Sequence, residues 1–423
     1  MMTMRARVVH RGVRRAVSAA VVGVFATIPA LAQEPGPAAP LNLSTAAAAG
    51  SSVPATGGAE PQAAGQSGNA ALSFFSTTEL SGFVDMYYNY NFNTPKVACA
   101  TVGGVAVFNC LRNFDVAHNS FSLNLAEVAV ERKPTAESRG GFRVDLDFGS
   151  ATSIVHGFEP GGTGIYQHIQ QGYISYLAPV GKGLQLDFGK FVTQHGAEVI
   201  ETKDNWNYSR SLLFALAIPY YHMGVRAIYA VNDQVTLAGS VNNGWNNVVD
   251  NNTGKTLGAQ LVYKPVSAVS VVANYMGGPE QTDNNDDWRH LFDATVAYTA
   301  TPQVSLMANY DYGRDTFGGT RTTWQGIGGY VKYQPRPWFA VIPRAEYLDD
   351  DDTFMTGTSQ KVGEVTLTAE FKHKDGVLMR VEYRGDFSDE PFFVKTEDDR
   401  TTHKKNQHSI AIGFVYAFST KAP

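Results

Sequence analysis

Short runs of alternating apolar and polar residues recur along most of this sequence. Within Gln171–Phe191, two such runs flank a turn that contains Pro179 and two glycines. Alternation with a period of two gives a strand one apolar and one polar face, and two strands around a tight turn form a β-hairpin. In the second run the apolar face holds Leu184, Leu186 and Phe188, and the polar face holds Gln185 and Asp187. The same pattern extends over residues 80–418.

Charged residues occupy many of the polar positions. In Phe142–Phe148, the residues Arg143, Asp145 and Asp147 alternate with apolar ones. Three charges on one strand would be costly in the dry core of a β-sandwich, but they cost little in a water-filled lumen. The pattern therefore favours a closed β-barrel with lipid outside and water inside.

The connections between strands alternate between short and long. Short turns lie near Pro134, Pro179, Asn232, Pro265, Pro302, Pro335 and Asp375; long connections are Asn93–Asn119, Ser150–Gly164, Thr193–Pro219, Asn243–Lys255, Gly277–Arg289, Gly313–Thr323, Leu348–Lys361 and Phe387–Gln407. Barrels of the outer membrane have short periplasmic turns and long outer loops in this order. We therefore predict an all-β fold, a transmembrane up-and-down antiparallel β-barrel of about 16 strands with both ends periplasmic. Glu127 falls where an apolar residue is due, which predicts a β-bulge near Ala126.

The N-terminal region differs in composition from the rest. Residues 1–32 combine five arginines, an apolar stretch and the small-residue sequence Ala30-Leu31-Ala32, as a secretory signal peptide does. A single helical anchor is the alternative, but the apolar stretch is short for a membrane span. Residues 33–78 are rich in Ala, Gly, Pro and Ser, which predicts a disordered leader. The barrel is then expected over residues 79–418, followed by a C-terminal tail at 419–423.

Charge and cysteine content narrow the partners and the compartment. Loss of the five N-terminal arginines moves the formal charge from −5 to −10, which argues against nucleic-acid binding. Cys99 and Cys110 share one predicted loop of an exported chain; this favours a disulfide, with free thiols as the alternative. Mean hydropathy is −0.18, and no long apolar run follows the N-terminal region, so a bundle of membrane helices is not expected.

Two segments carry a resemblance to a known family. The sequence from Trp206 to Tyr220, which reads WNYSRSLLFALAIPY, and the run Leu186–Phe191 resemble the OmpL-like type of β-barrel porin. Phe121–Glu131 is similar to an early strand of that family. The resemblance covers the whole predicted barrel and implies a pore in the bacterial outer membrane.

The resemblance also directs attention to Thr193–Pro219, the connection after the fifth predicted strand. In general porins this loop folds into the lumen and forms its narrowest point. Its apolar segment Leu212–Phe214 would then pack on the wall, because an exposed apolar run needs cover. An outer loop that lies over the mouth is the alternative. The candidate constriction residues are His195, Glu198, Glu201, Lys203, Asp204 and Arg210.

Charges on the predicted inner faces of strands would set the selectivity of a pore. The candidates are Arg143, Asp145, Asp147, Arg226, Arg344, Glu346, Arg380, Glu382 and Arg384. Alternatively, these side chains pair across strands along a solvated wall. Acidic runs at Asp283–Asp287, Asp349–Asp352 and Glu397–Asp399 could hold Ca²⁺ or Mg²⁺. Solvated loops explain them more simply, and we predict no metal site and no cofactor.

The expected function is an outer-membrane porin, a water-filled channel for passive diffusion of small hydrophilic solutes or ions. The alternatives are a solute-specific channel with a binding site, and a non-conducting barrel that displays loops as an adhesin or structural anchor. The sequence contains no HExxH, GxSxG or P-loop motif, so an enzyme is not expected. The expected partners are outer-membrane lipid, small hydrophilic solutes, the barrel-insertion machinery and, if the barrel assembles as a homotrimer, two further copies of the chain.

Overall fold

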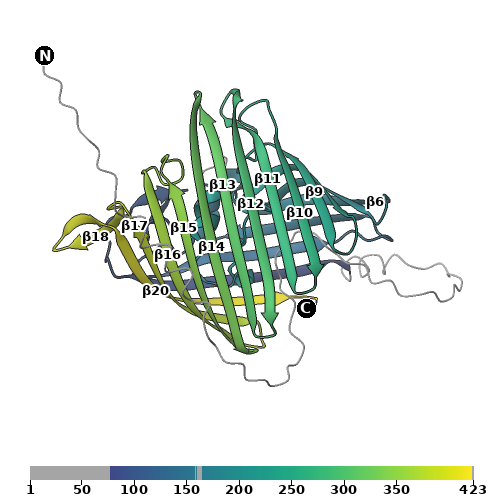
Figure 1. The fold of residues 1–423 in the computed structure, drawn as a ribbon. Coiled ribbons are helices and arrows are strands. Elements are labelled where there is room, and N and C mark those ends of the chain that lie inside the picture. The colour runs from purple at the N-terminus through teal and green to yellow at the C-terminus, as the bar shows by residue number, and fades with distance from the viewer. Residues whose placement is uncertain (1–76, 158, 160–163, 422–423) are drawn as a thin grey trace, which may run out of the picture. The chain divides into compact units, whose positions relative to one another are not determined.

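Sixteen antiparallel strands form one closed barrel in the computed structural model, which describes residues 77–157, 159 and 164–421 (Figure 1). The predicted fold class and strand count are confirmed. The predicted signal peptide, almost all of the predicted leader and the last two residues of the tail lie outside the described residues. None of the helices in the described part is long and apolar enough to cross a bilayer.

Neighbouring barrel strands follow one another along the chain, and the two ends meet. The barrel strands are β1 Glu79–Asn91, β4 Ser120–Arg132, β5 Gly140–Phe148, β6 Ile169–Ala178, β7 Leu184–Val192, β8 Tyr221–Ala230, β9 Val235–Asn242, β10 Thr256–Val266, β11 Val269–Gln281, β12 Asn284–Thr301, β13 Val304–Phe317, β14 Thr320–Arg336, β15 Phe339–Asp350, β16 Gln360–Lys372, β17 Val377–Ser388 and β20 Asn406–Ser419. Strand β1 pairs with both β4 and β20. No edge of the sheet is therefore left unpaired, as a membrane-spanning sheet requires.

The long connections carry the remaining elements. These are β2 Ala100–Val102, β3 Val105–Val107, α2 Ser150–Val155, η1 Gly164–Tyr166, η2 Thr202–Asp204, the π-helical turn η3 Leu213–Ala217, β18 Phe393–Glu397 and β19 Arg400–Lys404. Strands β2 and β3 form one small hairpin, and β18 and β19 form another.

Apolar and polar side chains alternate along the strands, with the apolar ones on the outer face and the polar ones on the inner face of the barrel. Outward positions hold exposed apolar side chains such as Phe188 and Leu237, which are 58% and 45% exposed. Inward positions hold polar side chains such as Asp145 and Asp187, both fully buried within the barrel. Lipid can cover the outer apolar band, and the polar groups find partners inside.

The predicted irregularity of the second barrel strand is a β-bulge. Asp85 pairs with Leu125 and Met86 pairs with Leu123, so Asn124 is the extra residue, two positions before Ala126. The Asn124 amide donates a hydrogen bond of 2.6 Å to the Asp85 carboxylate. The bulge therefore turns a polar group into the barrel and restores the apolar phase on the outside.

Two predicted loops are strands instead. Gly277–Arg289 belongs mostly to the β11–β12 hairpin, and Gly313–Thr323 to the β13–β14 hairpin, which turns at Gly318 and Gly319. Both glycines have positive φ, +55° and +77°, as a tight hairpin turn requires. The prediction of loops was wrong because these residues are polar on both faces. Strand ends that extend beyond the membrane need no apolar face, so they lack the alternation by which a strand is predicted.

The structure joins Cys99 and Cys110 in a disulfide within the β1–β4 connection, with the two Cα atoms 5.6 Å apart. The disulfide encloses the β2–β3 hairpin, and Phe393 and Val394 of β18 pack against it. The first and last long connections therefore support each other across the β1–β20 junction.

An arginine on the outer face should be far more damaging than one on the inner face. Leu237 and Ala238 are adjacent in β9, but Leu237 faces lipid whereas Ala238 faces the lumen beside Gln260. We expect Leu237→Arg to cost about 2–4 kcal/mol near the bilayer midplane and Ala238→Arg much less. Urea unfolding of the barrel in vesicles measures both. Equal losses of stability would contradict the assignment of faces.

Candidate pore and its inward-folded loop

The connection Thr193–Pro219 between β7 and β8 crosses the inside of the barrel. Its Asn207 amide donates to the Ile342 carbonyl on β15 at 3.1 Å and to the Thr368 hydroxyl on β16 at 2.7 Å. The Tyr208 hydroxyl donates to the Asp85 carboxylate on β1 at 2.8 Å. A loop bonded to inner faces of strands so far from its own must lie within the lumen. We call it the inner loop.

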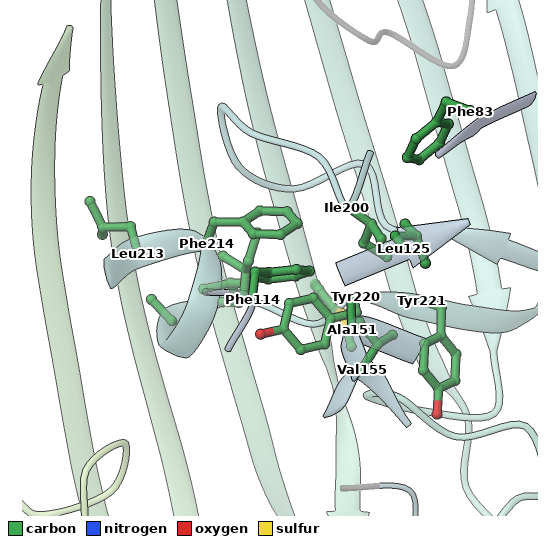
Figure 2. Close-up of a cluster of buried hydrophobic side chains, with 14 of the residues drawn as sticks. Phe83, Phe114, Leu125, Ala151, Val155, Ile200, Leu213, Phe214, Tyr220 and Tyr221 are labelled. Atoms are coloured by element: carbon green, nitrogen blue, oxygen red, sulfur yellow. The ribbon is translucent and has the colours of Figure 1, made fainter. Parts of the chain in front are cut away.

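The apolar segment of the inner loop rests on the barrel wall. Leu213 lies so close to Gly326 of β14 that a Cβ there would come within 2.6 Å of it. The Trp324 indole donates to the Ala217 carbonyl at 3.1 Å. Figure 2 shows the helical turn with Leu213 and Phe214 in front of the strands, and Phe114 and Tyr220 beside it. The apolar run is thus buried against β14 and the β1–β4 connection.

Three inward arginines on β15 and β17 hold the backbone of the inner loop. Arg344 donates to the Ser209 carbonyl at 2.7 Å, and Arg380 donates to the Thr202 carbonyl at 2.7 Å. Arg384 donates to the Arg210 carbonyl at 2.5 Å. Each arginine also pairs with a carboxylate of the wall: Arg344 with Glu364, Arg380 with Glu370, and Arg384 with Asp386.

Inward carboxylates accept the N–H groups of the same loop. Glu382 accepts from the backbone of Tyr208 and Ser209 at 2.7 and 2.9 Å. Glu346 accepts from Leu212 at 2.7 Å. Glu198 on the loop itself accepts from Ser211 at 2.7 Å and pairs with Arg344. We call this set the loop anchor; its members are Arg344, Arg380, Arg384, Glu198, Glu346 and Glu382. It provides hydrogen-bond partners for backbone groups of the inner loop that are not paired in a helix or strand.

The loop anchor does not face open water. Arg344, Arg380 and Arg384 are 2%, 1% and 1% exposed, and Glu346 and Glu382 are also buried. The expectation that these wall charges line a water-filled lumen is wrong for this side of the barrel, because the inner loop covers them. Arg226 and Asp145 are likewise buried in ion pairs, with Asp187 at 2.9 Å and Arg143 at 2.9 Å.

The charged residues of the inner loop have different surroundings. Lys203 and Asp204 pair with each other at 2.5 Å and keep 30% and 37% of their side chains exposed. Arg210 is buried, donates to backbone carbonyls and lies 4.5 Å from the Phe114 ring. Burial lowers the pKa of Arg210. Glu201 is buried and receives no ion pair within the described chain.

His195 is a neutral group at the start of the inner loop. Burial lowers its pKa to about 3, so the ring carries no charge at neutral pH. The Thr193 hydroxyl lies 3.1 Å from His195 and 3.2 Å from His222 on β8. His195 therefore belongs to a hydrogen-bonded cluster that fixes where the loop leaves β7, and adds no charge to the lumen.

Water reaches inner charges mainly beside β4, β5 and η2. The side chains of Arg143 and Glu131 are 29% and 21% exposed and lie 3.8 Å apart. Lys203 and Asp204 on η2 are the other partly exposed charges of the candidate set. Of the predicted pore residues, Arg143, Lys203 and Asp204 are the ones whose side chains stay partly exposed.

Several residues of the interior were not predicted. Asn113 of the β1–β4 connection donates to the Ala215 carbonyl at 2.8 Å and so reaches the inner loop. Arg112 pairs with Asp386 at 2.8 Å. Glu364 and Asp386 continue the inward alternation of their strands, and that pattern was available in the sequence. No local pattern could have placed Arg112 and Asn113, since they lie in an irregular connection.

One acidic run, Asp349–Asp352, binds partly within its own connection. Asp350 accepts hydrogen bonds from the backbone of Met355 and Thr356 at 3.0 and 2.7 Å, and Asp351 pairs with Lys361 at 2.7 Å. Among the residues that the structure describes, no three His, Cys, Asp or Glu side chains come together to hold a metal ion.

Comparison with protein families gives a match over nearly the whole barrel. The model described as "Putative beta-barrel porin-2, OmpL-like" matches residues 77–418. The chain belongs to this family. It is therefore an outer-membrane β-barrel of the porin type, located in the bacterial outer membrane. No curated protein matches this OmpL-like porin.

Solved structures share the fold at low sequence identity. OmpT of Vibrio cholerae in its trimer form is 12% identical, with 81% of this chain and 99% of that chain covered and a TM-score of 0.53. The outer-membrane channel DcaP of Acinetobacter baumannii is 13% identical over 81% and 97%, with a TM-score of 0.51. An anion-selective porin from Comamonas acidovorans is 9% identical over 81% and 99%, also at 0.51. At these identities the likeness is one of fold.

Proposed function

We propose that this OmpL-like porin forms a channel for passive diffusion of small hydrophilic solutes or ions across the outer membrane. The observation that carries the proposal is the inner loop, which is bonded to the wall on the far side of the barrel and leaves the side chains of Lys203 and Asp204 partly exposed. A loop held inside a barrel narrows the lumen, and charged groups at a narrow point sort solutes by size and charge.

The pore residues have two roles under this proposal. Arg143, Lys203 and Asp204 contact the passing solute, because they are the partly exposed charges beside η2. The loop anchor and Arg210 fix the shape of the constriction without meeting the solute, since they are buried. A channel with a dedicated binding site would instead need further groups directed at one solute.

A non-conducting barrel is the second candidate, and one observation favours it. The inner side chains of β16, β17 and β20 are buried over almost their whole length. A barrel filled to this degree conducts only if a continuous aqueous path remains along β4–β10. An adhesin or structural anchor would need no such path.

Single-channel recording of the purified barrel in a planar bilayer separates the candidates. We expect discrete current steps that grow linearly with salt concentration. Conductance that saturates with one solute would favour a channel with a binding site. If the protein inserts and folds but gives no current steps, the result would favour the non-conducting barrel.

We also propose a homotrimer, on the basis that the OmpT structure of Vibrio cholerae is described as a trimer form. Chemical cross-linking of the barrel in native outer membranes tests the assembly. A ladder that ends at three copies is expected, and cross-linking that never exceeds the single chain would contradict it.

A further inference from the structure

One carboxylate contacts three basic groups at the end of the barrel that carries the short β14–β15 and β16–β17 turns. Glu370 of β16 accepts from Arg380 of β17 at 2.7 Å with one oxygen. Its other oxygen lies 3.2 Å from the ammonium of Lys332 on β14 and 3.3 Å from that of Lys372 on β16. Ala340 of β15 is opposite Glu370 in the register, and its small side chain lets Lys332 reach across that strand. Three bases and one acid give this cluster an excess of positive charge.

The two lysines differ from Arg380 in how fully their donors are used. The Arg380 guanidinium also donates to the Thr202 and Asn207 carbonyls of the inner loop, at 2.7 and 3.1 Å. Lys332 and Lys372 share a single carboxylate oxygen, so each ammonium keeps N–H groups that this oxygen cannot accept. The side chain of Lys372 is 45% exposed and that of Lys332 is 13% exposed. Solvent and dissolved anions can therefore reach the pair.

An aromatic ring of the inner loop borders the same two lysines. The Lys332 ammonium lies 5.9 Å from the centre of the Trp206 ring. Trp206 is half-buried, so part of its indole stays open to solvent. Arg380 donates to the carbonyls of Asn205 and Asn207, the residues on either side of Trp206. The contact between Arg380 and the inner loop thus fixes the ring beside the basic cluster.

We propose that Lys332, Lys372 and Trp206 form a binding site for small organic anions, namely carboxylates that carry an apolar or aromatic group. The carboxylate of such a solute would bridge the two ammonium groups, which lie close together because both contact one oxygen. Its apolar part would lie against the indole.

The inference deepens the proposed channel function, and it rests on that function for the passage of these solutes. Two charges and one ring recognise a class of solutes rather than a single one. A weak site of this kind at one mouth of the pore raises the local concentration of its solutes and still lets them leave.

The test is equilibrium binding of para-fluorobenzoate to the full-length barrel, folded in a nonionic detergent and followed by fluorine NMR. We expect saturable binding by the parent protein. Lys332→Gln and Lys372→Gln should each raise the dissociation constant about threefold or more, because each removes a positive charge beside the carboxylate. Trp206→Leu should raise it by about the same factor through loss of the ring contact, but it should leave competition by acetate unchanged.

Lys264→Gln is the matched control, since Lys264 is an exposed lysine at the same end of the barrel on β10. It removes the same charge and should leave the dissociation constant unchanged. An equal loss of binding in Lys264→Gln, Lys332→Gln and Lys372→Gln would overturn the site, because overall charge alone would then explain it. So would a parent protein that binds fluorobenzoate no better than empty micelles do, whether or not any variant folds.

Planar bilayers separate the site from the channel function. Benzoate added to a conducting parent barrel should reduce the chloride current through transient occupancy, and Lys372→Gln should weaken this block about threefold. A parent protein that binds fluorobenzoate but gives no current steps would overturn the channel function and not the site. Current steps without any binding of fluorobenzoate would overturn the site and leave the channel function intact.

Discussion

Shortening the inner loop should widen the pore without opening the barrel. We would replace Glu201–Ala215 with a short Gly-Ser linker, which removes the bonds to Ile342, Thr368 and Asp85. The strand ladder closes without this loop, so the wall should still form. The wall charges of the loop anchor would then meet water and still pair with one another. We expect single-channel conductance to rise by about twofold or more, with passage of larger solutes.

Some loss of stability should accompany the change. Phe114 is buried partly by Phe214, which the deletion removes, and its exposure costs apolar contact. A lower melting temperature with an intact heat-modifiable band on a gel is the expected pattern. A linker of equal length inserted at the exposed Gly357 is the control. Parent-like conductance from the shortened, folded barrel would contradict a constriction at this loop.

Removing Arg344 should release the inner loop. Its guanidinium is fully buried and bonds to Glu364 at 2.8 Å, to Glu198 at 2.9 Å and to the Ser209 carbonyl at 2.7 Å. Arg344→Met leaves Glu198 without its basic partner and the Ser209 carbonyl without its donor, and Glu364 keeps only Arg384 as a basic partner in the described chain. We expect this to cost about 3–5 kcal/mol. We expect faster tryptic cleavage at Lys203 and Arg210, together with a noisier single-channel current.

A matched substitution separates anchoring from a general loss of charge. Lys361→Met breaks an exposed pair with Asp351 and should cost about 1 kcal/mol or less. Adding Glu198→Gln to Arg344→Met should restore part of the stability, because Arg344 is the basic partner of Glu198 in the described chain. Cleavage rates and currents that match those of the parent would show that the loop is held by its apolar contacts alone.

The sequence predicts the wall of this barrel better than its contents. Alternation of apolar and polar residues predicts a strand that has one face in lipid. The strand Phe142–Phe148 and the bulge near Ala126 could therefore be located from the sequence alone. The hairpin tips beyond the membrane have no apolar face, and Gly277–Arg289 and Gly313–Thr323 were therefore taken for loops. A strand is therefore predictable from its sequence where it contacts lipid on one face and water on the other, and not where both faces contact water.

The inner charges show a second limit. Alternation places Arg344, Arg380 and Glu382 on the inner face, as the structure does, but it cannot reveal what covers them. Their partners Ser209 and Tyr208 lie more than a hundred residues away in an irregular segment. No periodicity links such positions, so the difference between a water-lined wall and a buried anchor appears only in three dimensions.

The junction of β1 with β20 constrains how the barrel can fold. Every other neighbouring pair of barrel strands is joined by one connection of the chain, whereas this pair unites Ser81 with Ser419. Bringing such distant segments together carries the largest loop-closure entropy, so closure of the wall should come last.

The disulfide has the opposite character, since Cys99 and Cys110 are separated by only 11 positions. It can form while the strands are still assembling. Its surroundings complete only at closure, when Gln407 donates to the Cys110 carbonyl at 2.8 Å and Phe393 packs beside it. The β1–β4 connection, already closed by its disulfide, can therefore form the surface on which the β17–β20 connection packs. The last step of assembly then joins two connections that have already folded.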